Sequence, residues 1–277
     1  MPTAKQAVQR VLLNTSLGRV MYRVPLAALR GKALQQWPGW VERFYEIRVP
    51  SATVANETAA PKGPANINII LELLDATSEV DGDVAECGVF RGQTVVPIAL
   101  YLRERSLDRR VFGLDSFQGF DDAVKVDMAL GGADHPTKAV HGFSATSLDL
   151  VSNKARLFGV EDRIELLPGY FEQTLPALQN RSFSFVHLDC DLYESYKACL
   201  EFFYPRMPVG GVILLDEYDD PPWPGCNKAV DEFLAGKAEG VHEIERDNYI
   251  KYFIRKEAGA VAEPEAPRGF GGPLRSD

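Results

Sequence analysis

The spacing of apolar positions changes along this chain and predicts an alternation of strands and helices. Short apolar runs bounded by glycine, proline or polar residues predict strands at 84–87, 111–114, 164–167, 183–188, 212–215, 241–244 and 249–254. Helical spacing of apolar residues occurs at 67–76, 94–103, 145–158, 175–178, 194–204 and 228–235. Such alternation is typical of a parallel sheet with helices on both faces.

The last two predicted strands differ from the others because only residues 245–248 separate them. This connection is too short for a crossover helix, so we expect the pair to be antiparallel. Two connections, 116–143 and 217–227, are long for a compact domain, and long loops after strand ends are often lids or substrate walls. Either segment would also fit a simple insertion.

We expect three parts: an N-terminal helical arm and lid at 1–80, an α/β domain at 81–255 and a disordered tail at 256–277. The tail is rich in Ala, Gly, Pro and Glu. The chain of 277 residues is 45% hydrophobic and 25% charged, which is ordinary for a soluble globular protein. No window approaches 18 continuous apolar residues, so we expect no transmembrane segment.

Charge is distributed unevenly along the chain. The net charge of −9 argues against nucleic acid as the main partner. Residues 1–41 hold six basic and no acidic residues, which leaves a net of −15 for residues 42–277. We interpret the basic segment as a helical arm packed on the domain. A membrane surface, an acidic partner, the acidic body of its own oligomer and a transit peptide are the alternatives, and no secretory signal pattern is present.

The four cysteines are Cys87, Cys190, Cys199 and Cys226, and none forms a C-x-x-C pair. Cys87 and Cys190 lie at predicted strands, so we interpret them as buried thiols in a reducing compartment and expect a cytoplasmic protein.

A glycine-containing turn follows the first predicted strand. Glu86, Gly88 and Gly92 lie where that strand would pass into a helix, and glycine there lets the backbone approach a ligand. The spacing departs from the dinucleotide fingerprint, which disfavours NAD. An acid inside the motif suits a ligand with an ammonium group, and Arg91 would pair with a carboxylate or be only a surface charge. The alternative is a simple turn between strand and helix.

Asp115 ends the next predicted strand. An acid at this place can accept hydrogen bonds from both hydroxyls of a ribose, although a turn or N-cap aspartate is the alternative. Together with the glycine turn, Asp115 fits S-adenosylmethionine, with the ribose on Asp115 and the methionine end near residues 86–92.

Acidic residues end the fourth and fifth predicted strands. Asp189 and Asp191 follow one, and Asp216 and Glu217 follow the other, so adjacent strands would bring these acids together. Crowded carboxylates raise each other's pKa values unless a cation neutralises them. Oxygen ligands indicate a hard ion, Mg²⁺ or else Ca²⁺ or Mn²⁺, which could bind two vicinal substrate hydroxyls. Helix capping and solvated loops are the alternative.

The histidines give little evidence for catalysis. His187 lies in an apolar strand, and we interpret it as a core histidine rather than a base. His135 and His141 lie in the long loop and are candidate substrate contacts. No Ser/His/Asp or Cys/His arrangement has supporting context, and G-x-S-x-G is absent from the sequence.

Five ordered motifs make residues 80–255 resemble the macrocin O-methyltransferase family. They are Glu86-Cys-Gly-Val-Phe-Arg-Gly92, Gly113-Leu-Asp-Ser-Phe-Gln-Gly-Phe120, Pro168-Gly-Tyr-Phe-Glu-Gln-Thr-Leu-Pro176, His187-Leu-Asp-Cys-Asp-Leu-Tyr-Glu-Ser195 and Gly210-Gly-Val-Ile-Leu-Leu-Asp-Glu-Tyr218. The resemblance implies a Rossmann-like class I methyltransferase fold, with a mostly parallel seven-stranded sheet and an antiparallel last strand. It also implies S-adenosylmethionine, Mg²⁺ and methyl transfer to a sugar hydroxyl in antibiotic biosynthesis.

The resemblance also assigns roles to residues of this chain. Asp189, Asp216 and Glu217 would bind the metal, and Asp189 would accept the proton, with Asp191 as the alternative. Tyr193 would lie near the cofactor or the metal. The predicted cofactor-binding residues are Glu86, Gly88, Arg91, Gly92, Asp115, Ser116, Gly169, Phe171 and Asp189.

Two residues depart from the family pattern. Glu217 stands where a second aspartate is usual, and Cys190 where glycine is usual. The acceptor would be a sugar of a natural product, a nucleotide-sugar or a glycan, and we expect a homo-oligomer. The alternatives are a catechol-like phenol acceptor, for which Trp223 is an argument, a cofactor-binding protein without turnover, and an NAD(P)-dependent oxidoreductase. The oxidoreductase lacks its glycine fingerprint and a catalytic Tyr/Lys pair in context.

Overall fold

A computed structural model of the chain describes residues 65–120, 125–131, 143–246 and 248–258. The predicted arm before residue 65, the tail after residue 258, and His135 and His141 therefore lie outside the described residues.

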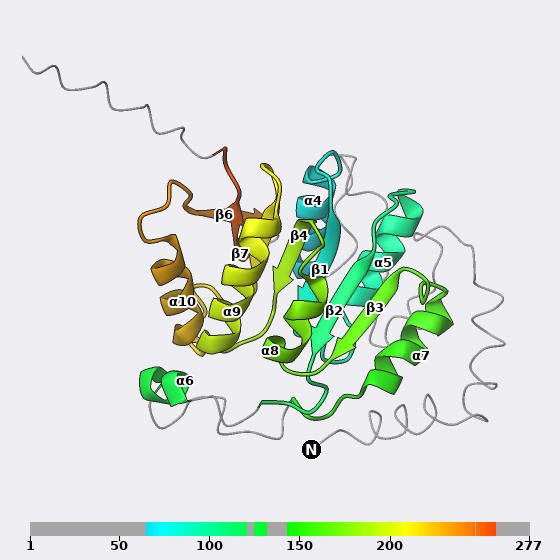
Figure 1. The fold of residues 1–277 in the computed structure, drawn as a ribbon, viewed down its shortest axis with the longest axis horizontal. Helices are drawn as coiled ribbons and strands as arrows, with labels where there is room; N and C mark the ends of the chain where they lie inside the picture. The colour runs from blue at the N-terminus through cyan, green and yellow to red at the C-terminus, as the bar shows by residue number, and fades with distance from the viewer. Residues whose placement is uncertain (1–64, 121–124, 132–142, 247, 259–277) are drawn as a thin grey trace, which may run out of the picture.

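Seven strands form one sheet in the order β3-β2-β1-β4-β5-β7-β6 (Figure 1). The first five strands run parallel, whereas β7 is antiparallel to both β5 and β6. This arrangement confirms the predicted fold, including the antiparallel closing pair. The strands are β1 (Asp83–Cys87), β2 (Val111–Asp115), β3 (Ile164–Pro168), β4 (Phe183–Leu188), β5 (Val212–Leu215), β6 (Val241–Arg246) and β7 (Tyr249–Arg255).

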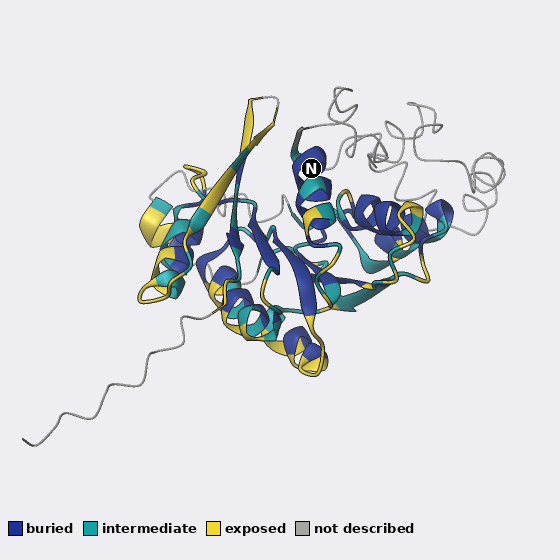
Figure 2. Cartoon of the chain, turned by 90° about the horizontal axis from the view of Figure 1, so that it is seen from above, coloured by how far each residue is buried: buried dark blue, intermediate teal, exposed yellow. Residues whose placement is uncertain are grey.

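Helices cover both faces of this sheet and form two hydrophobic clusters with it. The first cluster contains side chains of α4 (Ala65–Ala76), α5 (Val95–Glu104) and α7 (Leu148–Phe158). The second contains side chains of η5 (Leu175–Leu178), α9 (Tyr193–Phe203) and α10 (Pro224–Leu234). The short helices α8 (Phe171–Thr174) and η6 (Tyr204–Arg206) complete this second layer. Figure 2 shows the buried strands between the two helical layers.

Helix α4 belongs to the core of the domain. Its apolar side chains, among them Leu71 and Leu74, are buried in the first cluster with strand and helix residues of the domain. The folded unit therefore includes residues that precede Asp81, where we placed the start of the domain.

Helix boundaries differ from the predicted ones where turn chemistry decides them. The segment predicted at 145–158 becomes helical at Leu148, because the Ser147 side chain accepts a hydrogen bond from the backbone N–H of Leu150 (3.2 Å). Helix α10 begins at Pro224, inside the predicted loop, where proline suits the first helical turn. The predicted loop 116–143 contains the unpredicted helix α6 (Lys125–Gly131).

The β6–β7 hairpin is the most exposed part of the sheet. Tyr249 and Ile250 at its tip are exposed, and Figure 2 shows this tip standing out from the body. The Nε of Arg246 donates a hydrogen bond of 2.8 Å to Glu72 of α4, which ties the hairpin to the domain. In the part of the chain that the structure describes, each helix is too short or too polar to span a membrane.

Candidate active site

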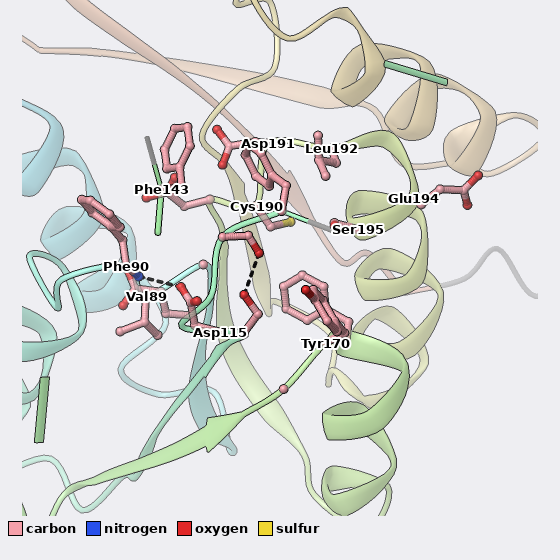
Figure 3. A pocket seen from close by; sticks show the side chains of 18 of the residues that line it. Val89, Phe90, Asp115, Phe143, Tyr170, Cys190, Asp191, Leu192, Glu194 and Ser195 are labelled. Atoms are coloured by element: carbon pink, nitrogen blue, oxygen red, sulfur yellow. Dashed lines mark hydrogen bonds between the residues drawn. The ribbon is translucent and has the colours of Figure 1, made fainter. Parts of the chain in front are cut away.

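A cavity of about 380 Å³ opens at the carboxyl ends of the parallel strands. The loops that follow β1, β2, β3 and β4 supply its walls, with Phe143 added from the long loop (Figure 3). In this strand order, connections leave the sheet in opposite directions on either side of β1 and β4. The cavity therefore lies at the topological switch point, where open α/β sheets bind their ligands.

The loop after β1 lies against the end of β4 because residue 88 is glycine. Gly88 has a φ of +94°, and a Cβ there would lie 1.6 Å from the backbone oxygen of Asp189. The backbone N–H of Asp189 donates to the carbonyl of Cys87 at 2.9 Å, which fixes the two strand ends together. Glycine at position 88 thus allows the loop after β1, predicted to bind the methyl donor, to contact the end of β4, which precedes the predicted metal ligand Asp189.

Arg91 and Gly92 hold this loop from behind rather than lining the cavity. Seven of the nine predicted cofactor-binding residues line the cavity, and these two do not. The Arg91 side chain is buried, and the backbone carbonyl of Arg91 accepts a hydrogen bond from Lys154 Nζ (2.8 Å). A Cβ on Gly92 would lie 2.9 Å from Val151 of α7. Their contribution to a cofactor site would be to shape the loop.

Asp115 joins the loops that follow β1 and β2. One carboxylate oxygen accepts the backbone N–H of Phe90 (2.7 Å, dashed in Figure 3) and the other accepts that of Phe117 (2.6 Å). Burial raises the pKa of Asp115, although these hydrogen bonds oppose the shift. Asp115 lines the cavity. It is thus both a connector of two loops and an acceptor at the predicted ribose position.

The other predicted donor-site residues lie on neighbouring loops. The Ser116 hydroxyl donates to the carbonyl of Gly119 (2.8 Å), which tightens the turn after β2. The backbone N–H of Gly169 donates to the carbonyl of Asp115 (2.9 Å), so the turn after β3 is fixed to the same strand end. Phe171 and Glu86 complete the predicted residues at the cavity wall.

Three carboxylates converge beside this cavity. Asp189, Asp216 and Glu217 each offer an oxygen that lies within 4.8 Å of the other two. Strand pairing causes the convergence, because Leu188 is in register with Leu215 and the backbone N–H of Asp216 donates to the carbonyl of Leu188 (2.9 Å). Despite its extra methylene, Glu217 has its carboxylate within the group.

Two cations partly neutralise these acids. Lys251 Nζ lies 2.5 Å from Asp216 Oδ1, and His187 Nε2 lies 3.3 Å from the same oxygen. Although burial raises it, the pKa of Asp216 falls to about 2 because of these two partners. The pKa of Asp189 rises to about 6, through burial and the nearby Asp216 charge. Burial and the same acidic neighbours raise the pKa of Glu217 as well.

The donor set fits a hard divalent cation. In Glu217 and in Asp216, protein partners contact one of the two carboxylate oxygens. Glu217 Oε2 accepts a hydrogen bond from the Tyr196 hydroxyl (2.7 Å), and Asp216 Oδ1 faces Lys251 and His187. The second carboxylate oxygen of each can therefore serve a metal. Burial and the nearby Asp216 charge raise the pKa of Asp189, a shift that a bound cation would offset, and carboxylate oxygens are the ligands that Mg²⁺ prefers.

Asp191 lies in the same cavity wall but outside the three-carboxylate group. Its φ of +63° is unusual for a residue other than glycine. Cys226 Sγ donates to the backbone carbonyl of Asp191 (3.1 Å), which supports this conformation. In Figure 3 the Asp191 side chain lies on the cavity side, whereas the Glu194 carboxylate points away from the other labelled side chains.

An aromatic wall closes the cavity on the side of the two long loops. Phe143 packs against Phe90 and Phe120, with ring centroids 5.9 and 4.9 Å apart. Trp223, from the proline-rich loop after β5, packs edge-on against Phe120 and Phe143 at 6.2 and 6.3 Å. Phe90, Phe120 and Phe143 line the cavity, and Trp223 supports them.

Sequence reasoning missed Lys251 and understated His187. Lys251 is a buried lysine within an otherwise apolar strand, and that pattern was the available signal. His187 is indeed buried, but it contacts two carboxylates. The missed cavity residues, apart from the aromatic wall, are Gln93, Thr94, Gly119, Glu172, Cys190, Leu192, Glu194 and Ser195. All of them except Gln93 and Thr94 lie inside the five motifs already identified.

The sequence profile of the family described as "Macrocin-O-methyltransferase (TylF)" matches residues 66–253. The demethyldecarbamoylnovobiocin O-methyltransferase of Streptomyces niveus is 33% identical over 174 residues, which are 61% of this chain and 65% of that protein, just under two thirds of its length. The mycinamicin III 3''-O-methyltransferase of Micromonospora griseorubida is 31% identical over 221 residues, covering 75% of this chain and 82% of that protein.

Solved structures show the same architecture. The O-methyltransferase NovP superposes with a TM-score of 0.58 at 31% identity, covering 70% of this chain and 78% of NovP. The calicheamicin methyltransferase CalS11 superposes with a TM-score of 0.57 at 22% identity, covering 87% of this chain and 94% of CalS11. The second likeness concerns the fold alone.

Proposed function

Because this chain belongs to the macrocin O-methyltransferase family, we propose that it transfers a methyl group to a sugar hydroxyl with the help of a divalent cation. The chain is an O-methyltransferase, as its relatives are by name, and its methyl donor would be S-adenosylmethionine. The observation that carries the metal-dependent form of the reaction is the convergence of Asp189, Asp216 and Glu217 beside the cavity.

The methyl donor would occupy the half of the cavity formed by the loops after β1, β2 and β3. Glu86 there would face the ammonium group of the methionine moiety, and Asp115 would accept from the ribose hydroxyls. The turns at Gly88 and Gly169 leave space for the ligand because neither carries a side chain. The acceptor would reach the donor from the side of the loop after β4, which carries Asp189 and Asp191.

Asp189, Asp216 and Glu217 would hold the metal. A bound Mg²⁺ would supply Lewis acidity, which lowers the pKa of an acceptor hydroxyl and fixes its position. Lys251 and His187 hold the Asp216 carboxylate in place. The buried position of Glu217 and its bond to Tyr196 restrict that carboxylate to one orientation.

Asp189 is our candidate for the proton acceptor, with Asp191 as the alternative. Burial and the Asp216 charge raise the pKa of Asp189 to about 6, closer to the working pH than that of an ordinary aspartate. As the acceptor oxygen bonds to the methyl carbon, the carbon–sulfur bond breaks and the hydroxyl proton passes to the carboxylate. The products are a methyl ether and S-adenosylhomocysteine.

The names of the relatives above specify demethyldecarbamoylnovobiocin and mycinamicin III, which supports a natural product as the acceptor, with a sugar hydroxyl as its proposed methylation site. A nucleotide-sugar or a glycan shares the vicinal hydroxyls that the proposed metal would bind. Isotope-labelled S-adenosylmethionine, incubated with the protein, Mg²⁺ and a panel of glycosides, tests this function. We expect label in a methyl ether and no transfer after chelation of the metal. Transfer unaffected by chelation would contradict the metal-dependent mechanism, and donor binding without transfer to any glycoside would contradict the acceptor class.

The aromatic wall favours a second candidate, a catechol-like phenol. Phe90, Phe120 and Phe143 line the cavity and could stack on a flat ring, while two adjacent phenolic hydroxyls would suit the same metal. Adding catechols to the same panel separates the two acceptors. Methylation of a catechol with no glycoside turned over would favour the phenol.

A further inference from the structure

Four charged side chains form a row across neighbouring strands, next to the carboxyl ends of β1, β4 and β5. Glu86 lies on β1, His187 on β4, Asp216 directly after β5 and Lys251 on β7, and these strands are consecutive in the sheet. Glu86 is in register with His187, and His187 with Leu214, two residues before Asp216. Side chains alternate along a strand, so these residues share one face of the sheet. Acids and bases alternate along the row.

His187 contacts both acids in this row, whereas Lys251 contacts one. His187 Nδ1 lies 3.4 Å from Glu86 Oε1, which is within ion-pair distance but lacks the alignment of a hydrogen bond, and its Nε2 forms a hydrogen bond of 3.3 Å with Asp216 Oδ1. Lys251 Nζ lies 2.5 Å from Asp216 Oδ1 and donates to the Asp216 carbonyl at 2.8 Å. His187 and Glu86 are each only 1% exposed, so water does not replace these contacts.

Glu86 still has a buried oxygen to offer. Among the described residues, Glu86 Oε2 has no hydrogen-bond partner, and Glu86 lines the cavity. A buried carboxylate oxygen without a partner is costly, which indicates a place where a ligand supplies a donor. The imidazole of His187 therefore lies between two carboxylates. Glu86 faces the part of the cavity proposed for the methyl donor, and Asp216 belongs to the three-carboxylate group proposed to bind the metal.

We propose that His187 is a positioning residue for two ligands at once. Through one ring nitrogen it orients Glu86 toward the ammonium group of the methyl donor, and through the other it orients Asp216 toward the metal. This role rests on the function proposed above. A planar ring packed between two strands fixes both carboxylates relative to each other. The methyl donor and the metal-held acceptor are therefore kept in register by one side chain.

Binding affinities distinguish this role from that of a metal ligand. Glu86, His187 and Asp189 offer ligand atoms within 4.8 Å of one another, so His187 could in principle bind a metal directly. A metal ligand would affect metal affinity alone, whereas a positioning residue between the two sites must affect both affinities. The separate affinities for the two ligands therefore decide between the roles.

The test is calorimetric titration of the full-length, metal-free protein with S-adenosylhomocysteine and, separately, with MgCl₂. The variants are His187→Phe, which keeps a ring without N–H groups, and His187→Gln, which keeps an N–H donor. Lys251→Met removes the cation that contacts Asp216 alone. His242→Gln, on the exposed face of β6, is the matched control.

We expect His187→Phe to weaken both ligands by roughly 10- to 100-fold, the range seen when residues that support metal ligands are removed. His187→Gln should recover part of both affinities. Lys251→Met should weaken Mg²⁺ binding while S-adenosylhomocysteine binding stays close to that of the wild type, and His242→Gln should change neither. A melting curve for each variant shows whether it is folded, and His187→Gln carries the test if His187→Phe does not fold.

Three results would overturn the positioning role. If only Mg²⁺ affinity falls in both His187 variants, His187 belongs to the metal site alone. If His187→Phe binds both ligands normally while His187→Gln does not, the ring only fills space. Wild-type protein that binds neither ligand would contradict the proposed function, and this role with it. Wild-type binding of both ligands together with either of the first two results overturns the positioning role alone.

Discussion

Two neighbouring parts of the site are held in shape by different forces. The donor half is the cavity lined by the loops after β1, β2 and β3, and the acidic half is the group of Asp189, Asp216 and Glu217 beside it. In the donor half, glycine and backbone amides set the geometry, as at Gly88 against the end of β4 and at Asp115 with the amides of Phe90 and Phe117. In the acidic half, charged side chains set the geometry, as at Asp216 between Lys251 and His187. The first half depends on backbone shape and the second on charge.

This difference indicates how each half should respond to substitution. A side chain added to the backbone-held half collides with main-chain atoms, so the fold should suffer before the chemistry does. A charge removed from the acidic half leaves the backbone in place, so the chemistry should suffer while the fold persists.

Asp189→Asn should have the largest effect on turnover. The change keeps the shape of residue 189 but removes a metal ligand and the candidate proton acceptor, so we expect kcat to fall by about 100- to 10,000-fold. S-adenosylhomocysteine affinity should change little, because Asp189 acts mainly in the acidic half. Labelled methyl transfer and calorimetry measure the two quantities. If Asp189→Asn lost affinity for S-adenosylhomocysteine but kept a normal kcat at saturating donor, Asp189 would belong to the donor half, contrary to the division proposed here.

Asp191→Asn is the companion variant. If Asp189 accepts the proton, Asp191→Asn should retain much more activity than Asp189→Asn at saturating Mg²⁺. If instead Asp191→Asn abolishes turnover and leaves Mg²⁺ affinity intact, Asp191 is the base.

Gly88→Ala should have the largest effect on stability. Its Cβ would lie 1.6 Å from a backbone oxygen, at a φ that L side chains rarely adopt, so we expect the free energy of unfolding to fall by at least about 2 kcal/mol. Gly240→Ala is the control, because a Cβ there meets nothing within 4 Å. Denaturant unfolding measures both variants. Equal stability of the two would contradict the close approach of β1 and β4.

Asp115→Ala should weaken the donor and leave the metal site unchanged. It removes the acceptor of two backbone N–H groups that shape the donor loops, so we expect S-adenosylhomocysteine affinity to fall by about tenfold or more. Asp115→Asn, which keeps one carbonyl oxygen, should lose less. Calorimetric Mg²⁺ affinity should be unaffected in both. A parallel loss of Mg²⁺ affinity would mean that the two halves are not separate.

Asp127→Ala should have the smallest effect. Both Asp127 oxygens accept the backbone N–H of Tyr193, at 3.1 and 3.2 Å, so α6 caps the helix that follows Asp189 and Asp191. The close fit requires Gly225, whose Cβ would lie 1.9 Å from Asp127 Oδ1. Loss of an N-cap costs about 1 kcal/mol, which thermal unfolding would detect. Asp127→Asn should lose less, and equal losses would show that the contact is not a cap.

The sequence predicted the fold and the acidic cluster because both follow from local patterns. Apolar runs marked the strands, and acids at the ends of two neighbouring parallel strands must lie near each other. Gly88 and Asp115 were selected as candidate cofactor-binding residues for the same reason, because strand ends and glycine turns can be recognised from the sequence alone. Asp216 and Glu217 are within reach of Asp189 as predicted.

Other features depend on contacts that the sequence does not display. Lys251 reaches Asp216 because β7 inserts antiparallel beside β5, and that pairing joins residues far apart in the chain. Helix α6 is a short helix whose buried Asp127 bonds to α9. The aromatic wall joins Phe120 and Phe143 to Trp223 across two loops whose lengths alone do not fix their paths. Each of these is a tertiary contact rather than a local pattern.

A crystal structure tests directly whether Asp189, Asp216 and Glu217 bind a divalent cation beside the methyl donor. The crystals would be grown with MnCl₂ and S-adenosylhomocysteine, and anomalous scattering would locate the metal. We predict one manganese ion bonded to oxygens of Asp189, Asp216 and Glu217, beside S-adenosylhomocysteine in the cavity. A structure in which the product fills the cavity while those three carboxylates turn apart, with no anomalous peak between them, would contradict the account.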